Sequence, residues 1–216
     1  MTRRRPVLVA AAAAAAGLVT TLGAPPAAQA ATPCSDVELV VARGTSEPGT
    51  LGVVVGDNVL AETRRALPGR NVTAYAVDYP AGFDPTSPGL GMVDTVEHVT
   101  GQAAACPGQR FVLVGYSQGA QVIDGALGVD TTGTINGGPP PAVIPASVAP
   151  RIAAVTLFGN PITAIGRTVP PEYFSRTLDV CQDGDPVCEA DAVNIVAHLL
   201  YFLDAPAAAG FIAGKV

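Results

Sequence analysis

A mostly apolar run, Arg110 to Val114, is expected to form a buried strand and leads directly into Gly115-Tyr116-Ser117-Gln118-Gly119, and residues with helical spacing follow. This G-x-S-x-G pattern is typical of a nucleophile elbow, a strained strand-to-helix turn that lifts a serine hydroxyl above the edge of a parallel sheet. Glycine tolerates the backbone conformations that such a turn requires. The same residues could also form a tight turn whose serine caps a helix. A catalytic role for Ser117 therefore requires that the chain also supply a base and an acid to activate its hydroxyl.

The rest of the sequence alternates short apolar runs with segments of helical period. Strands are expected over residues 37–42, 72–77, 110–114, 152–158 and 177–181, and helices over residues 52–67, 89–105, 118–127 and 202–216. Such alternation is typical of parallel sheets covered by helices. We expect an α/β fold, a three-layer α/β/α hydrolase-type sandwich with a mostly parallel central sheet. The Gly- and Pro-rich segment Thr131–Pro150 is a long loop of the kind that often carries function.

The N-terminal segment has the composition of an export signal. Arg3 to Arg5 are followed by an almost unbroken apolar stretch, Pro6 to Leu22, and by the small residues of Ala28-Gln29-Ala30. We expect residues 1–30 to be a secretory signal peptide and residues 31–216 to be a single domain, found outside the cell or at its envelope. An uncleaved membrane anchor is the alternative, but the alanine-rich stretch is only weakly hydrophobic. No stable membrane insertion is expected after cleavage.

The charge pattern excludes one class of partner. Twelve Lys and Arg stand against eighteen Asp and Glu, and the sequence has no basic run beyond Arg3 to Arg5. Proteins that hold a phosphate backbone carry a basic patch or stripe, so nucleic acid is not an expected partner. We expect an acidic monomer that acts on a small or lipid-like molecule.

Four cysteines follow the predicted cleavage point, and an even count in an exported chain indicates two disulfides. They are Cys34, Cys106, Cys181 and Cys188. Three pairings exist in principle, and the six residues between Cys181 and Cys188 favour local closure, which leaves Cys34 to Cys106. No CxxC pair occurs, and the two histidines are not at zinc-like spacing from the cysteines, so no metal site is expected.

A serine hydroxyl becomes a good nucleophile only when a neighbouring base takes its proton, and in α/β hydrolases the acid and then the histidine follow the serine in the chain. His198 is the one histidine after Ser117. Four aspartates lie between them: Asp179, Asp183, Asp185 and Asp191. Asp185 is favoured because the Cys181 to Cys188 loop would hold it rigidly, and Asp183 is the alternative.

An oxyanion formed during acyl transfer needs hydrogen-bond donors. The backbone N–H of Gln118, directly after the serine, is the usual first donor, and Thr45, after the first expected strand, is the candidate for the second. Apolar residues flank these positions and predict a substrate groove: Phe83, Val193, Ile195 and Val196. Carbohydrate sites often stack sugars on aromatic rings, but this chain has no tryptophan and 5% aromatic residues, which favours aliphatic esters.

Taken together, these features resemble the cutinase family of secreted serine esterases, and most of all its actinobacterial members. The matching segments, in family order, are Ala42-Arg43-Gly44-Thr45-Ser46-Glu47-Pro48-Gly49, Tyr79-Pro80-Ala81, Gly115-Tyr116-Ser117-Gln118-Gly119-Ala120, Phe158-Gly159-Asn160-Pro161, Gly184-Asp185-Pro186-Val187-Cys188 and His198. The resemblance implies a small fold without a large lid. One departure is Thr45, where fungal members carry serine.

The resemblance also implies site roles and an activity. The triad would be Ser117, Asp185 and His198, the oxyanion hole Thr45 and Gln118, and the disulfides Cys34–Cys106 and Cys181–Cys188. No cofactor is implied. The expected activity is hydrolysis of short to medium acyl esters, extending to cutin-like polyester, triacylglycerol or phospholipid, through an acyl-enzyme. Two alternatives stay open: a carbohydrate deacetylase of the acetylxylan type, which shares the scaffold, and a secreted binding protein with an idle site.

Overall fold

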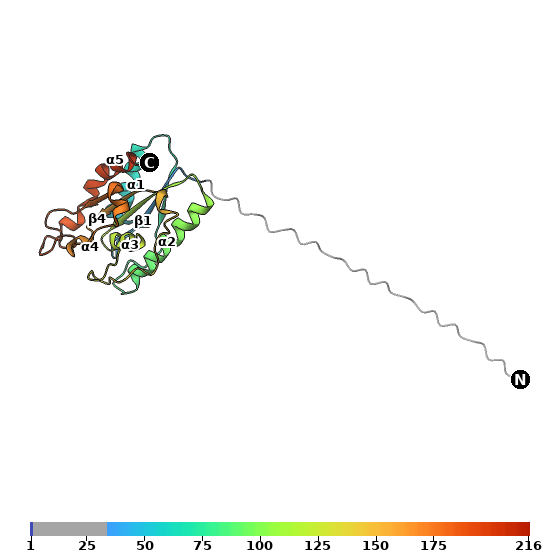
Figure 1. Ribbon diagram of the computed structural model, residues 1–216, viewed down its shortest axis with the longest axis horizontal. Coiled ribbons are helices and arrows are strands. Elements are labelled where there is room, and N and C mark those ends of the chain that lie inside the picture. The colour runs from blue at the N-terminus through green and yellow to red at the C-terminus, as the bar shows by residue number, and fades with distance from the viewer. Residues whose placement is uncertain (2–33) are drawn as a thin grey trace. The chain divides into compact units, whose positions relative to one another are not determined.

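A computed structural model describes Met1 and residues 34–216, so the predicted signal peptide lies outside the described residues apart from Met1. Five parallel strands form the central sheet, in the order β2-β1-β3-β4-β5 (Figure 1). Their bounds are Val37–Ala42 for β1, Val72–Ala76 for β2, Arg110–Tyr116 for β3, Ile152–Phe158 for β4 and Thr177–Val180 for β5. The expected α/β sandwich around a parallel sheet is confirmed.

Helices cover both faces of this sheet. The helices α1 (Asp57–Ala66) and α5 (Ala205–Ala213) pack together on one face, and α2 (Ser87–Ala105) and α3 (Gln118–Ala126) pack together on the other (Figure 1). A short helix, α4 (Pro161–Ala164), follows β4. Short 3-10 helices occupy Ala149–Arg151, Pro171–Arg176, Ala197–Leu199 and Tyr201–Asp204.

The core lies on both sides of the three middle strands. Successive side chains of a strand point to opposite faces, so Val37, Leu39 and Val41 of β1 join the α1 and α5 side, whereas Val40 joins the α2 and α3 side. All six residues of β1 are buried. A strand covered on both faces has no solvent-facing side, which explains why all of its residues except Glu38 are apolar, and Glu38 is paired with His98.

Only β1 and β4 keep both expected bounds, and the other elements shift at one end or more. The helix expected over residues 52–67 begins as a π-helical turn, Gly52–Gly56, and becomes α-helical at Asp57. The last expected helix is divided, because the 3-10 turn Tyr201–Asp204 precedes α5. The strand β3 continues two residues further than expected, to Tyr116, so that the strand leads directly into the serine.

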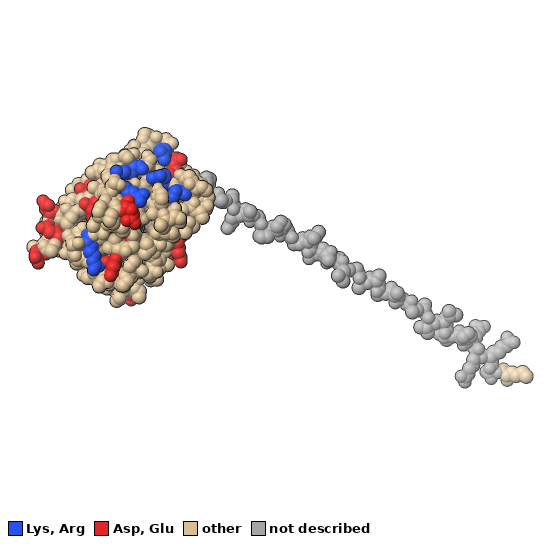
Figure 2. All heavy atoms as spheres, in the orientation of Figure 1, with Lys and Arg blue, Asp and Glu red and all other residues tan. Residues whose placement is uncertain are grey.

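Both disulfides pair as the sequence suggested. Cys34–Cys106 joins the segment before β1 to the end of α2, and Cys181–Cys188 closes the loop after β5. In the part of the chain that is described, no helix combines the length and the apolar character needed to cross a bilayer. On the face drawn in Figure 2, most of the basic side chains gather near one end, acidic side chains are spread over the face and stand at the opposite end, and the rest of the surface is uncharged.

Candidate active site

Ser117 lies in the turn between β3 and α3 with a strained backbone, at φ +55° and ψ −121°. A residue other than glycine in this region costs of order 1–3 kcal/mol and persists only where the surrounding structure enforces it. Two contacts hold the turn. The Ser117 N–H donates to the carbonyl of Phe158 at 2.9 Å, and α3 begins so close to β1 that a Cβ on Gly119 would lie 1.9 Å from the carbonyl oxygen of Ala42. The sequence therefore needs glycine two residues after the serine.

A line of hydrogen-bonded groups runs from Ser117 through His198 to Asp185. His198 Nε2 lies 2.9 Å from Ser117 Oγ, and His198 Nδ1 lies 2.8 Å from Asp185 Oδ2. Asp185 is fully buried, and its other oxygen accepts the N–H of Val187 at 2.8 Å. This arrangement permits the imidazole to take a proton from the serine while the carboxylate orients it and stabilises its positive charge.

Two tyrosines support this line from the side of α5. The Tyr201 hydroxyl donates to Asp185 Oδ2 at 2.6 Å and accepts the N–H of Gln182 at 3.0 Å. Burial, together with the bonded carboxylate, raises the pKa of Tyr201, so the phenol stays protonated and remains a donor. The Tyr116 hydroxyl donates to the backbone carbonyl of His198 at 2.7 Å. The sequence did not reveal either role, because each contact joins residues far apart in the chain.

The backbone after β4 contacts the other side of the histidine ring. Gly159 has φ +55°, and a Cβ placed there would lie 2.7 Å from His198 Cε1 and 3.0 Å from Asp185 Oδ2. Only a residue without a side chain leaves room for the imidazole at this point. This steric requirement accounts for the glycine in the Phe158-Gly159-Asn160-Pro161 segment.

The loop that carries Thr45 is held by a half-buried carboxylate. Glu47 accepts the N–H of Gly44 at 2.8 Å and the N–H of Val54 at 2.6 Å. Burial raises the pKa of Glu47, and these backbone donors lower it in part. Thr45 lines the same cavity as Ser117. The backbone N–H of Gln118 is the first of α3 and has no acceptor within the helix, so it is free for a ligand oxygen.

The side chain of Gln118 positions a second loop. Its Nε2 donates to the carbonyl of Gly82 at 2.8 Å, and its Oε1 accepts the hydroxyl of Ser87 at 2.9 Å. Asn136 also donates to the carbonyl of Phe83 at 3.0 Å. These bonds hold the Ala81-Gly82-Phe83 loop beside the serine, and the sequence indicated none of them.

A cavity of about 540 Å³ opens beside Ser117 and His198, and most of its wall is apolar. Of the four predicted groove residues, Phe83 and Ile195 line this cavity, whereas Val193 and Val196 are exposed and lie outside its lining. Further apolar residues that were not among these predictions also line it, among them Ile135, Ile165 and Val187. They come from loops whose course the sequence could not give.

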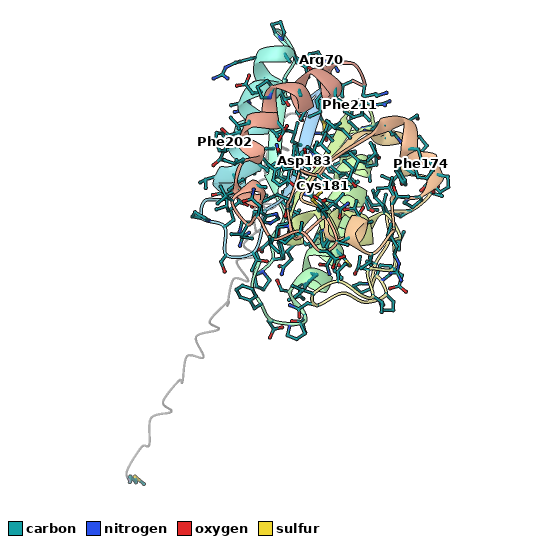
Figure 3. The ribbon with its side chains drawn as sticks, turned by 90° about the vertical axis from the view of Figure 1, so that its left-hand side faces the viewer. Arg70, Phe174, Cys181, Asp183, Phe202 and Phe211 are labelled. Atoms are coloured by element: carbon teal, nitrogen blue, oxygen red, sulfur yellow. A yellow bond between two sulfur atoms is a disulfide. The ribbon has the colours of Figure 1, made fainter. Side chains whose placement is uncertain are left out.

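The remaining acidic and histidine candidates lie elsewhere. Asp183, the alternative to Asp185, is exposed on the disulfide-closed loop. Figure 3 labels it near Cys181, where that loop begins. His98 lies on α2, where its Nε2 is 2.9 Å from Glu38 Oε2 and its ring stacks on Tyr75. Among residues 34–216, no group of three or more His, Cys, Asp or Glu side chains is arranged to hold a metal ion.

Comparison with known proteins identifies relatives. The sequence model of the Cutinase family matches residues 33–216. A cutinase of Kineococcus radiotolerans is 46% identical over 175 residues, which cover 79% of this chain but 58% of that relative's length. The carboxylesterase Culp1 of Mycobacterium tuberculosis is 36% identical, and the match covers 79% of this chain and 76% of Culp1. The phospholipase Culp4 of the same species is 38% identical, and the match covers 82% of this chain and 76% of Culp4.

Solved structures agree with this grouping. A Trichoderma reesei cutinase in complex with a phosphonate inhibitor superposes with a TM-score of 0.69 at 32% identity, covering 85% of this chain and 77% of that one. The catalytic core of a T. reesei acetyl xylan esterase superposes with a TM-score of 0.72 at 21% identity, over 85% of this chain and 100% of that one, which shows a shared fold. A carboxylic ester hydrolase is the activity that these relatives indicate, and the chain belongs to the cutinase family.

Proposed function

We propose that this protein is a secreted serine esterase that hydrolyses short to medium acyl esters through an acyl-enzyme intermediate. The observation that carries the proposal is the line from Ser117 Oγ through His198 to Asp185 at the wall of a largely apolar cavity. Serine, histidine and buried aspartate in this order of contact are the groups that acyl transfer requires.

The reaction follows from these contacts. His198 Nε2 takes the proton of Ser117 as Oγ attacks the ester carbonyl, and the backbone N–H groups of Gln118 and Thr45 stabilise the negative oxygen. When the intermediate collapses, the C–O bond to the alcohol breaks and His198 returns the proton to that alcohol. A water molecule then attacks the acyl-enzyme with His198 as the base, the acid leaves, and Ser117 regains its proton.

The composition of the cavity wall favours an uncharged acyl chain as the part of the substrate that is bound. None of the described residues that line the cavity is a lysine, arginine, aspartate or glutamate. Apolar side chains stand exposed around its mouth, with Phe83 and Ile135 each more than three quarters exposed. Exposed apolar groups around a cavity are typical of contact with a water-insoluble substrate. Cutin-like polyester, triacylglycerol and phospholipid acyl esters all fall within the proposed class.

Export and a monomeric state belong to the same proposal. Two disulfides among the described residues support an oxidising compartment, because thiols stay reduced in the cytosol. The N-terminal composition supports a signal peptide over residues 1–30. Secretion is tested by sequencing the N-terminus of protein recovered from culture medium, and the monomer by light scattering.

The decisive experiment is a hydrolysis profile against p-nitrophenyl esters from acetate to palmitate, measured for the mature protein and for Ser117→Ala. We expect a maximum between butyrate and octanoate and a loss of at least about a thousandfold in kcat in the variant, because the nucleophile is gone. Unfolding curves that coincide show that the variant folds.

Two other outcomes would contradict the proposal. Activity confined to acetate, together with release of acetate from acetylated xylan, would indicate a carbohydrate deacetylase. A protein that hydrolyses no ester and is not labelled by a serine-reactive organophosphate would be a binding protein with an idle site.

A further inference from the structure

Gln121 lies one turn after Ser117 on α3 and lines the same cavity. Its side chain is 2% exposed, and its Nε2 has no hydrogen-bond partner among the described residues. A buried donor left without a partner costs about 1–3 kcal/mol. An unpaired buried group in a folded protein calls for an explanation, and for a residue that lines a cavity one explanation is a partner bound in that cavity.

The other polar side chains along this part of the wall already have partners. Gln118, on the same helix, uses both ends of its amide, to Gly82 and Ser87. The hydroxyl of Thr134 donates to the carbonyl of Thr131 at 2.9 Å. Gln121 therefore differs from its neighbours in keeping a donor that the fold does not use.

The neighbourhood of Gln121 restricts what could pair with it. The amide is neutral, and the lining of the cavity includes no lysine or arginine to balance a phosphate or carboxylate. Apolar side chains of Ile135 and Ile165 line the same cavity. A neutral donor in such surroundings suits an uncharged acceptor, such as a hydroxyl, ether or ester oxygen.

We infer that Gln121 is a specificity-determining residue that donates a hydrogen bond to a second, uncharged oxygen of the ester substrate. The inference rests on the proposed esterase function and adds a substrate class to it, esters that carry another oxygen close to the bond that is cleaved. Four residues of α-helix rise about 6 Å, so this oxygen lies within a few bonds of the carbonyl that Ser117 attacks.

The test compares esters that differ by one oxygen. On the alcohol side, 2-hydroxyethyl butyrate is paired with propyl butyrate, and on the acyl side, methyl 4-methoxybutanoate is paired with methyl hexanoate. Acid release is followed by titration at constant pH for the wild type, for Gln121→Met and for Gln102→Met. The methionine at position 121 keeps the length of the side chain and removes its donor, and Gln102 is a half-buried glutamine of α2 outside the cavity lining.

We expect the wild type to favour the oxygenated member of at least one pair in kcat/KM, and Gln121→Met to lower that ratio about five- to tenfold, as the loss of one hydrogen bond would. The pair that responds shows whether the oxygen belongs to the acid or to the alcohol. Gln102→Met keeps the wild-type ratio.

Hydrolysis of all four esters without preference in the wild type would overturn the inference and leave the esterase proposal standing, even if Gln121→Met failed to fold. An equal ratio in the wild type and Gln121→Met would overturn it as well. No hydrolysis of any ester would overturn the proposed function, and the inference with it.

Discussion

The imidazole of His198 is positioned by contacts on each of its sides. Asp185 and Ser117 lie at its two nitrogens, the Tyr116 hydroxyl bonds to its backbone carbonyl, and Gly159 faces its ring. Hydrogen bonds set the angle of the ring, and the bare backbone of Gly159 sets the space that it occupies. The effect of a single added methyl group at this position can therefore be stated in advance.

Replacement of Gly159 by alanine should lower kcat at least tenfold, because the new Cβ would lie 2.7 Å from His198 Cε1 and would force the ring away from Ser117. Alanine at positive φ also costs about 1 kcal/mol of stability. Gly166 separates the two effects, because it has φ +72° with no atom within 4 Å of an added Cβ. Gly166→Ala should lose similar stability and keep its kcat. Steady-state kinetics and urea unfolding of both variants give the comparison, and equal kcat values would refute the steric argument.

At the scale of elements, the two disulfides affect different properties of the protein, one mainly its stability and the other mainly its catalysis. Cys34–Cys106 connects positions 72 residues apart, whereas Cys181–Cys188 connects positions seven apart and closes the loop that holds Asp185. The entropy removed from the unfolded chain grows with the length of the closed loop, from about 2 kcal/mol for the short loop to about 4 kcal/mol for the long one. The long bridge should therefore matter more for stability and the short one more for catalysis.

Removal of each bridge by paired serine substitutions tests this division. The Cys34→Ser/Cys106→Ser variant should lose about 4 kcal/mol of unfolding free energy and keep most of its kcat below its melting temperature. The Cys181→Ser/Cys188→Ser variant should lose about half that stability and at least tenfold in kcat, because Asp185 is then less firmly placed. Denaturant titrations and p-nitrophenyl butyrate kinetics measure both quantities. Unchanged turnover in the second variant would show that Tyr201 and Val187 suffice to hold the carboxylate.

The same scale shows what the sequence could and could not predict. The bounds of β1 and β4 agree with the expected ranges, because each is a short and mostly apolar run bounded by polar or small residues, and buried strands leave that pattern. The π-helical form of the segment that begins at Gly52 could not be predicted from a sequence pattern. Its residues fit a helical period, and its form depends on Glu47, whose carboxylate accepts the N–H of Val54 from another part of the loop.

A similar division holds for the site. Ser117 and His198 could be predicted because the elbow has a local sequence pattern and a single histidine follows it. Asp185 required the resemblance to a family to separate it from Asp183. Tyr201, Gly159 and Gln121 could not be predicted, since their roles arise where separate elements meet. Periodicity and spacing describe one element at a time, so contacts between elements leave no trace in them.

At the scale of the whole molecule, one carboxyl group lies in the core without a matching charge. Asp124, near the end of α3, is fully buried, and neither of its oxygens has a partner within hydrogen-bond distance among the described residues. Burial raises its pKa well above the usual range, Asp179 raises it further, and the nearby amide of Asn160 lowers it in part. The folded protein therefore holds this proton at pH values where the unfolded chain has released it.

This proton makes stability depend on pH with a definite sign. Above the pKa of about 3.9 that an aspartate has in the unfolded chain, the folded state binds more protons than the unfolded state, so this group lowers the unfolding free energy as the pH rises. Asp124→Asn keeps the shape and removes the titration. Its unfolding free energy relative to the wild type should therefore increase between pH 4 and pH 8, as measured by urea titration at each pH. Asp183→Asn, an exposed aspartate, is the control and should show no such increase. A constant difference for Asp124→Asn across this range would mean that the buried carboxyl is already ionised at pH 4, and that the interior around α3 supplies a donor to stabilise it.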